Sequence, residues 1–254
     1  ILFTFRPSYI DNSNRPTLSL SFRDRLTGNL ITDVRATRTQ TPPFFSNLLP
    51  EGPLREYLAE RAGVNPNREF FLLWALGKDL PGAITIEPPT GQATPFANSI
   101  KSKKAGPKNI LHFSLAGIQL KFSALLDAKK GLTIPVNGMH GSWIIKLPSQ
   151  KFEGIPENEF SMMTLARKLG MDVPDVQLVS LKKINDLPND LGTLSGPAFA
   201  VRRFDRTPNG PVHTEDFAQV FGVYPEKKYK HASYRNIADV IWREIGEPGI
   251  VEFI

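Results

Sequence analysis

A lysine and a glutamate thirteen positions apart are the pair best suited to chemistry in this chain of 254 residues. Lys146 lies in an apolar segment, residues 141–148, that alternates like a β-strand, and Glu159 opens the periodic, helix-like segment 159–169. An ammonium group among apolar neighbours must reach water, a carboxylate or an anionic ligand, because a buried unpaired charge is unfavourable. A strand lysine held by a carboxylate on the next helix can bind the phosphates of a nucleotide.

Two alternatives stay open for this pair. Lys146 could be a surface lysine whose apolar stem lies along an edge strand, and Glu157 could replace Glu159 as its partner. The alternation places Lys146 and Ile144 on one face of the strand and the aromatic and aliphatic residues between them on the other.

The turn from Ser114 to Lys121 combines small residues with a hydroxyl, an amide and an amine. Backbone N–H groups in such a turn can surround an anion. It contains one glycine, Gly117, and matches neither common glycine-rich phosphate motif, so a plain hairpin is the alternative. Farther along, the strand-like segment 198–204 ends in the mixed charges of residues 202–206.

These groups are expected on an α+β scaffold. The Pro-, Gly- and Lys-rich segment 87–109 predicts a linker, which divides the chain into units 1–98 and 99–254. Thr214 is expected to cap a short helix that ends at Gly222. The pattern predicts further helices over residues 53–62, 68–76, 159–169 and 234–245, and strands over residues 1–5, 17–22, 82–86, 110–113, 122–126, 143–147, 176–181 and 198–204.

The composition excludes several classes of site. Without cysteine the chain has no disulfide, no Cys-ligated zinc and no thiol nucleophile, and its four histidines are scattered. The net charge of +6 and the lysine clusters permit contact with nucleic acid, nucleotide or an acidic partner, and solvated loops are the alternative. No apolar run approaches the roughly 18 residues of a membrane span, so we expect no membrane contact, and the absence of cysteine fits the cytoplasmic location that we expect.

Taken in order, short stretches over nearly the whole chain resemble the HipA family of toxin Ser/Thr protein kinases. The matching stretches are residues 44–52 with Arg55, 76–83, 113–121, 144–148, 157–159, 169–174, 201–206, 217–222 and 228–229.

The resemblance implies a kinase-like fold that uses ATP and Mg²⁺. It assigns the phosphate loop to Ala116, Gly117, Ile118, Gln119 and Lys121, the phosphate contact to Lys146, and the support of that lysine to Glu159. It places the hinge, whose backbone would bind adenine, at Arg202, Arg203 and Phe204, although the family often has Glu at the position of Arg202. Ser114 matches the serine that family members autophosphorylate.

The family's catalytic loop, with the pattern N-x-D-x-H-x-K-N, does not occur in this sequence. We therefore expect the catalytic base and the Mg²⁺ ligands beyond Ile254, and no metal ligands within the chain. The expected fold is a protein-kinase-like N-terminal lobe in residues 99–254, preceded by a small α/β subdomain in residues 1–98 and lacking the helical C-terminal domain. Such a fragment is not expected to transfer phosphate alone.

Three functions follow from these observations. The first is the ATP-binding portion of a HipA-like kinase toxin, with an antitoxin partner and a protein substrate, of which the family implies an aminoacyl-tRNA synthetase. The second is a non-catalytic module that packs on an antitoxin or on a kinase core. The third, a protein that associates with nucleic acid, is supported only by the lysine clusters; in a toxin such contact would be indirect, through the antitoxin.

Overall fold

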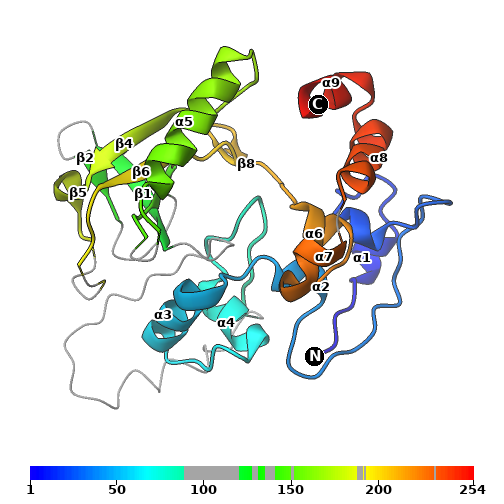
Figure 1. Cartoon of the computed structure of the whole chain (residues 1–254). Helices are drawn as coiled ribbons and strands as arrows, with labels where there is room; N and C mark the ends of the chain where they lie inside the picture. The colour runs from blue at the N-terminus through cyan, green and yellow to red at the C-terminus, as the bar shows by residue number, and fades with distance from the viewer. Residues whose placement is uncertain are drawn as a thin grey trace. The chain divides into compact units, whose positions relative to one another are not determined.

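The computed structural model describes residues 1–88, 120–127, 131–134, 141–149, 152–187, 191, 193–231 and 233–254. They form two compact units, residues 1–47 with 215–254 and residues 48–214, each described by itself below (Figure 1). Both helices and strands are present, as predicted. The predicted linker boundary near residue 98 and the predicted strand 110–113 lie outside the described residues. Within the described residues, no helix is both long and apolar enough to span a bilayer.

The first unit is built from short helices around a cluster of aromatic rings. Phe22 contacts both Phe3 and Phe5, with ring centroids 5.4 Å apart in each case, and Phe44 lies 6.1 Å from Phe22. The Gln219 side chain donates a hydrogen bond of 3.0 Å to the Phe44 carbonyl, which joins the two ends of the sequence. The elements are α1 (Pro7–Ile10), η1 (Leu20–Phe22), α2 (Pro43–Ser46), α6 (Phe217–Val220), η4 (Pro225–Lys227), α7 (Lys228–His231), α8 (Tyr234–Glu244) and α9 (Glu247–Phe253).

The strands predicted at residues 1–5 and 17–22 are wrong. Residues 1–6 are irregular, and residues 20–22 form the 3-10 helix η1. The alternation of Phe3 and Phe5 with other residues instead lets one side of an extended segment pack on Phe22, without a neighbouring strand. Alternation indicates a half-buried segment, and strand pairing needs a partner that the pattern does not specify.

Thr214 does not cap helix α6, contrary to the prediction. Asp216 is the N-cap: its carboxylate accepts the Gln219 N–H at 2.8 Å, and the Gln219 side chain accepts the Asp216 N–H at 2.8 Å. This reciprocal pair is a capping box, which satisfies two N–H groups and therefore outcompetes a lone threonine hydroxyl. The predicted helix at residues 234–245 is confirmed as α8.

Two helices open the second unit, as predicted. Helix α3 (Gly52–Ala62) ends at Gly63, whose left-handed backbone has a φ of 67°. Helix α4 (Glu69–Leu76) is almost entirely apolar and buries three leucines. Arg55 joins the helices through an ion pair of 3.3 Å with Glu69, whose side chain is only 2% exposed.

A six-stranded sheet follows in the order β4-β6-β3-β1-β2-β5. Phe122, Ile145 and Ala200 lie opposite one another on neighbouring strands and are fully buried, so one face of the sheet is apolar core. A short ribbon of β7 (Arg206–Thr207) and β8 (Gly210–Pro211) follows. The strands of the sheet are β1 (Lys121–Asp127), β2 (Gly131–Thr133), β3 (Trp143–Lys146), β4 (Val176–Ser180), β5 (Ile184–Asn185) and β6 (Pro197–Arg202).

Helix α5 (Ile155–Lys168) packs against β4 and β6. It begins four residues earlier than predicted, so Glu159 lies in its second turn and does not open it. The acidic residues suggested a later start, but Pro156 already fits the first turn of a helix, where its missing N–H needs no partner. The strand predicted at residues 82–86 is also wrong: this segment is irregular, and the Ile86 N–H donates to the Gly77 carbonyl at 2.9 Å.

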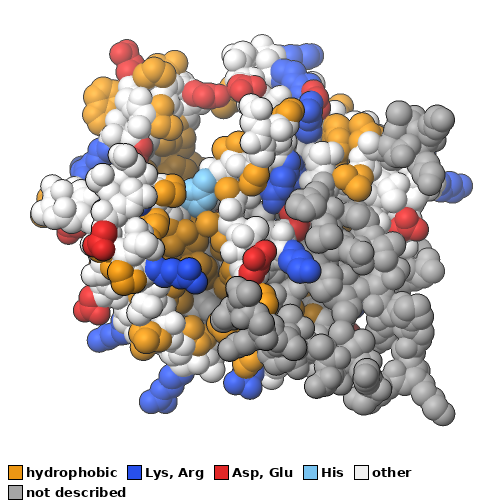
Figure 2. Space-filling view, turned by 180° about the vertical axis from the view of Figure 1, so that it is seen from behind, with side chains coloured by type: hydrophobic (Ala, Val, Ile, Leu, Met, Phe, Trp, Pro, Cys, Tyr) orange, Lys and Arg blue, Asp and Glu red, His pale blue; other side chains and the backbone are white. Residues whose placement is uncertain are grey.

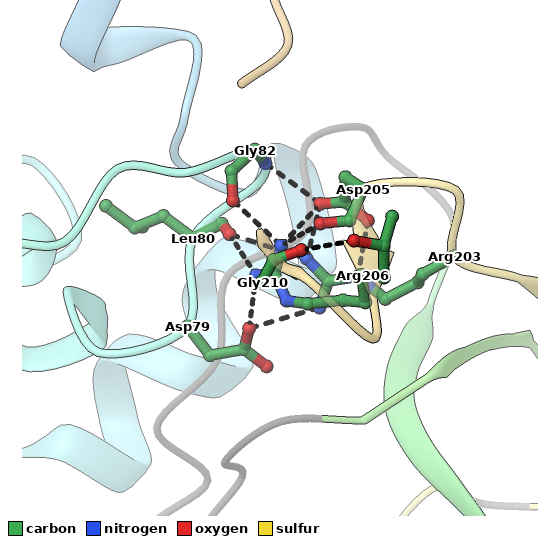
Figure 3. A network of polar contacts seen from close by, with 8 residues as sticks. Asp79, Leu80, Gly82, Arg203, Asp205, Arg206 and Gly210 are labelled. Carbon is green, nitrogen blue, oxygen red and sulfur yellow. Dashed lines mark hydrogen bonds and ion pairs between the residues drawn. The ribbon is translucent and has the colours of Figure 1, made fainter. Parts of the chain in front are cut away.

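Two arginines and two aspartates form a closed ring of ion pairs in the second unit (Figure 3). Arg203 lies 3.1 Å from Asp79 and 2.7 Å from Asp205. Arg206 contacts the same two carboxylates at 2.7 and 2.9 Å. The side chains of Arg203 and Asp79 are 1% exposed, and those of Asp205 and Arg206 are 10% and 16% exposed. Because the charges balance, each buried group has partners of opposite sign.

Backbone groups of the loop from Asp79 to Gly82 complete this ring. The Leu80 carbonyl accepts from Arg206 at 2.8 Å, and the Gly82 carbonyl accepts from the same guanidinium at 2.8 Å. The Gly82 N–H donates to Asp205 at 2.9 Å. The loop that follows α4 is thereby bound to the turn that follows β6 (Figure 3).

The ring shifts the pKa values of two members. Burial, the largest single influence on Asp205, raises its pKa, but the Arg203 hydrogen bond and charge, the Gly82 N–H and the Arg206 charge together outweigh it. The pKa of Asp205 is therefore held below its usual 3.8. For Arg203, burial lowers the pKa, and the bonds and charges of Asp205 and Asp79 more than reverse this effect.

We expect Asp205→Asn to destabilise the chain by about 3 kcal/mol at neutral pH, because it leaves a buried positive charge without its partner. A depressed carboxyl pKa contributes stability that is present above 3.8 and is lost as the pH falls below that value. The difference in unfolding free energy between the wild type and the variant, measured by urea denaturation, should therefore narrow from pH 5 to about pH 3. A difference that stays constant over this range would contradict the ionised role of Asp205.

Gly141 lies against strand β1, so Gly141→Ala should also destabilise the sheet. A Cβ there would come within 1.9 Å of the Ser123 hydroxyl and 2.5 Å of the Ala124 backbone nitrogen. Overpacking against backbone typically costs about 1–3 kcal/mol. Gly63→Ala is the control, because its Cβ would meet nothing within 4 Å and only its left-handed φ of 67° resists the change. Urea denaturation should show the larger loss for Gly141→Ala; equal losses would refute the close packing.

Candidate functional site

A row of side chains crosses three strands on the face opposite the apolar core. The register places Lys121 of β1 opposite Lys146 of β3, and Lys146 opposite Phe199 of β6. Directly opposed residues in antiparallel strands share a face, so both lysines point to the same side of the sheet. This confirms the predicted alternation, since Ile144 lies on the face of Lys146 while Trp143, Ile145 and Leu147 are buried on the other. Two lysines on one face of neighbouring strands add positive charge there, which favours binding of an anion.

Lys146 and Glu159 form an ion pair between strand β3 and helix α5. The two side chains are 23% and 29% exposed, so the pair lies at the edge of the packed interior and remains open to solvent. The Lys146 ammonium also lies 5.5 Å from the centre of the buried Phe199 ring, a cation–π distance. Glu159 therefore is the partner of Lys146, and the edge-strand alternative does not hold, because β3 lies between β1 and β6.

A cavity of about 760 Å³ opens on this same face of the sheet. Ile144 of β3, Val201 of β6 and Met163 of α5 form its apolar wall. Its volume is within the range of small-molecule sites, roughly 300–1,000 Å³. The remaining lining comes from two segments, residues 172–175 before β4 and residues 202–208 after β6.

The segment 202–204 forms the edge of the cavity. The Arg202 N–H donates to the Asp175 carbonyl and the Arg203 N–H to the Ser142 carbonyl, each at 2.8 Å. Phe204 is different: its side chain is 67% exposed, and its N–H makes no hydrogen bond to any residue that the structure describes. Phe204 thus lines the cavity with an N–H that has no partner among the described residues, while the Arg203 side chain is buried in the ion-pair ring.

The structure brings together part of the predicted site. Lys121, Lys146 and Glu159 meet on one face of the sheet, and Arg202, Arg203 and Phe204 line the neighbouring cavity. Ser114 and the predicted phosphate-loop residues Ala116, Gly117, Ile118 and Gln119 lie outside the described residues, so their predicted roles stay predictions.

Sequence reasoning missed the residues that hold this edge in place. Asp79, Asp205 and Arg206 were given no role, although both segments that carry them matched the family. Asp79 lies between Lys78 and Leu80 in a loop, and Asp205 lies between Phe204 and Arg206, so each resembles an ordinary solvated charge in the sequence. The segment 172–175 was also missed, because its part in the cavity depends on how α5 and β4 pack.

Metal and nucleic-acid sites find little support here. No group of three or more His, Asp or Glu side chains suited to a metal ion occurs among the residues described above. On the face shown in Figure 2, Lys and Arg side chains stand singly or in small groups among acidic and neutral ones. The described side chains on that face therefore form no continuous basic patch of the kind that binds nucleic acid.

Two family models match the chain. The model described as HipA N-terminal domain matches residues 1–87, and the model described as HipA-like C-terminal domain matches residues 113–251. The ion-pair ring joins the two matched regions, since Asp79, Leu80 and Gly82 belong to the first and Arg203, Asp205 and Arg206 to the second.

Curated relatives carry kinase names. A protein of Sinorhizobium fredii named "Putative kinase Y4dM" is 56% identical over 100% of this chain and 62% of the relative. A second from the same organism, "Putative kinase Y4mE", is 32% identical over 89% of this chain and 55% of the relative. The Serine/threonine-protein kinase toxin HipA of Shewanella oneidensis is 29% identical over 82% of this chain and 50% of the toxin. The chain thus spans between half and 62% of the length of these relatives.

Among solved structures, the complex of Shewanella oneidensis HipA, HipB and operator DNA contains a chain that is 28% identical. The match covers 78% of this chain and 48% of that one, with a TM-score of 0.49. Family membership rests on the sequence models, of which the HipA-like C-terminal domain alone accounts for more than half of the 254 residues. The chain belongs to the HipA family.

Proposed function

We propose that this chain binds ATP and that the whole protein is a Ser/Thr protein kinase toxin. The observation that carries the proposal is the Lys146–Glu159 ion pair beside a cavity of about 760 Å³. An ammonium paired with a carboxylate, on the same sheet face as a largely apolar cavity, suits a ligand with one anionic end and one flat apolar end. A nucleotide has that shape and charge, and the relatives' kinase names favour ATP.

Lys146 would bind the phosphates of ATP, and Glu159 would hold the ammonium in place. A charged hydrogen bond from a lysine is a strong phosphate contact because the charge is compact. Lys121, directly opposite on β1, adds a second positive charge to the same face. The residues predicted as a phosphate loop, 116–119, precede Lys121 directly in the sequence, which supports their assignment to the same end of the ligand.

The base would occupy the cavity against Ile144, Val201 and Met163. There the Phe204 N–H is a donor for a ring nitrogen of adenine, since the N–H groups of Arg202 and Arg203 already have partners. Arg202 replaces the Glu that is frequent in the family, but its side chain is 57% exposed and pairs with Asp175 at 3.5 Å. The backbone of the hinge can therefore serve without that Glu.

The transfer of phosphate needs a base and Mg²⁺, and we assign neither to the described residues of this chain. Mg²⁺ prefers carboxylate oxygens and would supply charge neutralisation at the phosphates when bound. The described residues provide no cluster of acidic groups for it. The contribution of this chain is to bind and orient ATP.

The name of the Shewanella relative supports a toxin–antitoxin setting for the whole protein. An antitoxin partner, a protein substrate such as an aminoacyl-tRNA synthetase, and indirect contact with nucleic acid through the antitoxin remain part of this proposal. No described surface favours one substrate over another.

Lys146→Ala should weaken ATP binding by about 10- to 100-fold, because a hydrogen bond between charged groups contributes roughly 1.5–3 kcal/mol. Isothermal titration calorimetry with ATP would measure the loss. Lys182→Ala is the matched control, since it removes the same charge from an exposed position away from the site. Unchanged affinity in Lys146→Ala would refute the phosphate contact. Absence of ATP binding by the wild type would favour a module that packs on an antitoxin or a kinase core.

Ser114 is the proposed site of autophosphorylation. A phosphate there adds about −2 charges near groups arranged for phosphates, so repulsion would displace ATP. Mass spectrometry of the whole protein, incubated with ATP and Mg²⁺, should find phosphate on the peptide containing Ser114, and Ser114→Ala should abolish it. Phosphate on a different peptide would refute the assignment.

A further inference from the structure

We propose that Asp79 is a positioning residue for the nucleotide base: it holds the turn that presents the Phe204 N–H. This inference rests on the proposed ATP site and names a residue outside that site as part of its machinery. Asp79 lines no part of the cavity, whereas Arg203, Asp205 and Arg206 all do. Asp79 therefore acts through the ring and does not touch the ligand.

The turn is held on both sides of Phe204. Arg203 precedes it with a side chain that is 1% exposed, and Asp205 follows it with one that is 10% exposed. Both side chains point into the ring, so the backbone between them has little freedom to rotate (Figure 3). The Phe204 backbone is thus held on both sides by side chains that belong to the ring.

Asp79 provides the link between this turn and the rest of the unit. Its Oδ1 atom accepts from Arg203 at 3.1 Å and from Arg206 at 2.7 Å. The loop it belongs to adds the Leu80 and Gly82 carbonyls and the Gly82 N–H. Gly82 itself has a φ of 72°, and a Cβ there would meet the Thr214 nitrogen at 2.9 Å, so the loop backbone packs closely against Thr214 at a position that requires glycine.

The arrangement gives the HipA N-terminal domain a role in nucleotide binding. Asp79 lies in the region matched by that domain, and the described residues that line the cavity all belong to the region matched by the C-terminal domain. The ring holds the turn that would bind the base, whereas Lys146 and Glu159, which would bind the phosphates, lie on β3 and α5. Loss of Asp79 should therefore change base binding and spare phosphate binding.

Asp79→Asn tests this with two ligands, ATP and inorganic tripolyphosphate, which share the phosphates and differ in the nucleoside. Asn keeps the acceptor at Oδ1, and the Oδ2 atom that it replaces makes no hydrogen bond to a described residue, so the substitution removes mainly the charge. Calorimetry should show the Kd for ATP raised about five-fold or more, with the Kd for tripolyphosphate unchanged within about two-fold. Lys146→Ala is the contrast, because it should weaken both ligands.

Circular dichroism shows whether Asp79→Asn folds. If Asp79→Asn does not fold, the same titrations are made with the double variant Asp79→Asn with Arg206→Gln. The double variant removes one charge of each sign and leaves Arg203 paired with Asp205. A selective loss for ATP in the folded variant supports the positioning role. Equal losses for both ligands, or no loss, overturn it. If the wild type binds tripolyphosphate but not ATP, or neither, the proposed nucleotide site itself fails, and the inference fails with it.

Discussion

Two guanidinium groups and two carboxylates lie together in the interior of the second unit, where charged groups are normally too costly to bury. Each of the four contacts both groups of opposite sign, at 2.7–3.1 Å, and the sum of the charges is zero. Removal of a single member leaves an uncompensated charge, so each member depends on the other three. The loop after α4, the turn after β6 and the edge of the cavity all depend on this ring.

The two faces of the sheet have different roles, because successive side chains along each strand point to opposite faces. On one face Phe122, Ile145 and Ala200 form the core, and on the other Lys121 and Lys146 stand in a row that ends at Phe199. A lysine can project from an otherwise apolar strand because helix α5 supplies Glu159 on that face only. The same helix supplies Met163 to the cavity, so one element positions both ends of the proposed ligand.

Local sequence patterns predicted the parts of the fold that local forces determine. Several regular elements were predicted close to their observed bounds, because each has a clear periodicity of apolar residues or a glycine or proline at its end. These elements are helices α3, α4 and α8 and strands β1, β3, β4 and β6. The segments 1–5, 17–22 and 82–86 were not, since an extended segment becomes a strand only if a neighbour pairs with it.

In the candidate site, too, local sequence predicted one feature and missed another that depends on contacts between distant segments. The Lys146–Glu159 pair could be predicted because a lysine in an apolar strand needs a nearby carboxylate, and the next helix offered one. The ion-pair ring could not, since Asp79 lies 124 and 127 residues from its two arginine partners along the chain, and each member looks locally like a solvated charge. The family resemblance identified both segments but did not indicate that they touch.

The different exposure of the two charged groupings has a consequence for their response to salt. Dissolved ions screen charges beyond about 8 Å at physiological ionic strength, and they act far less on pairs that solvent cannot reach. The side chains of the ring are only 1–16% exposed, so salt weakens its ion pairs little. Lys146 and Glu159 are 23% and 29% exposed, so salt weakens their ion pair more. A high salt concentration would thus weaken anion binding at Lys146 before it weakened the ion-pair ring. The chain could therefore lose its affinity for an anion and remain folded.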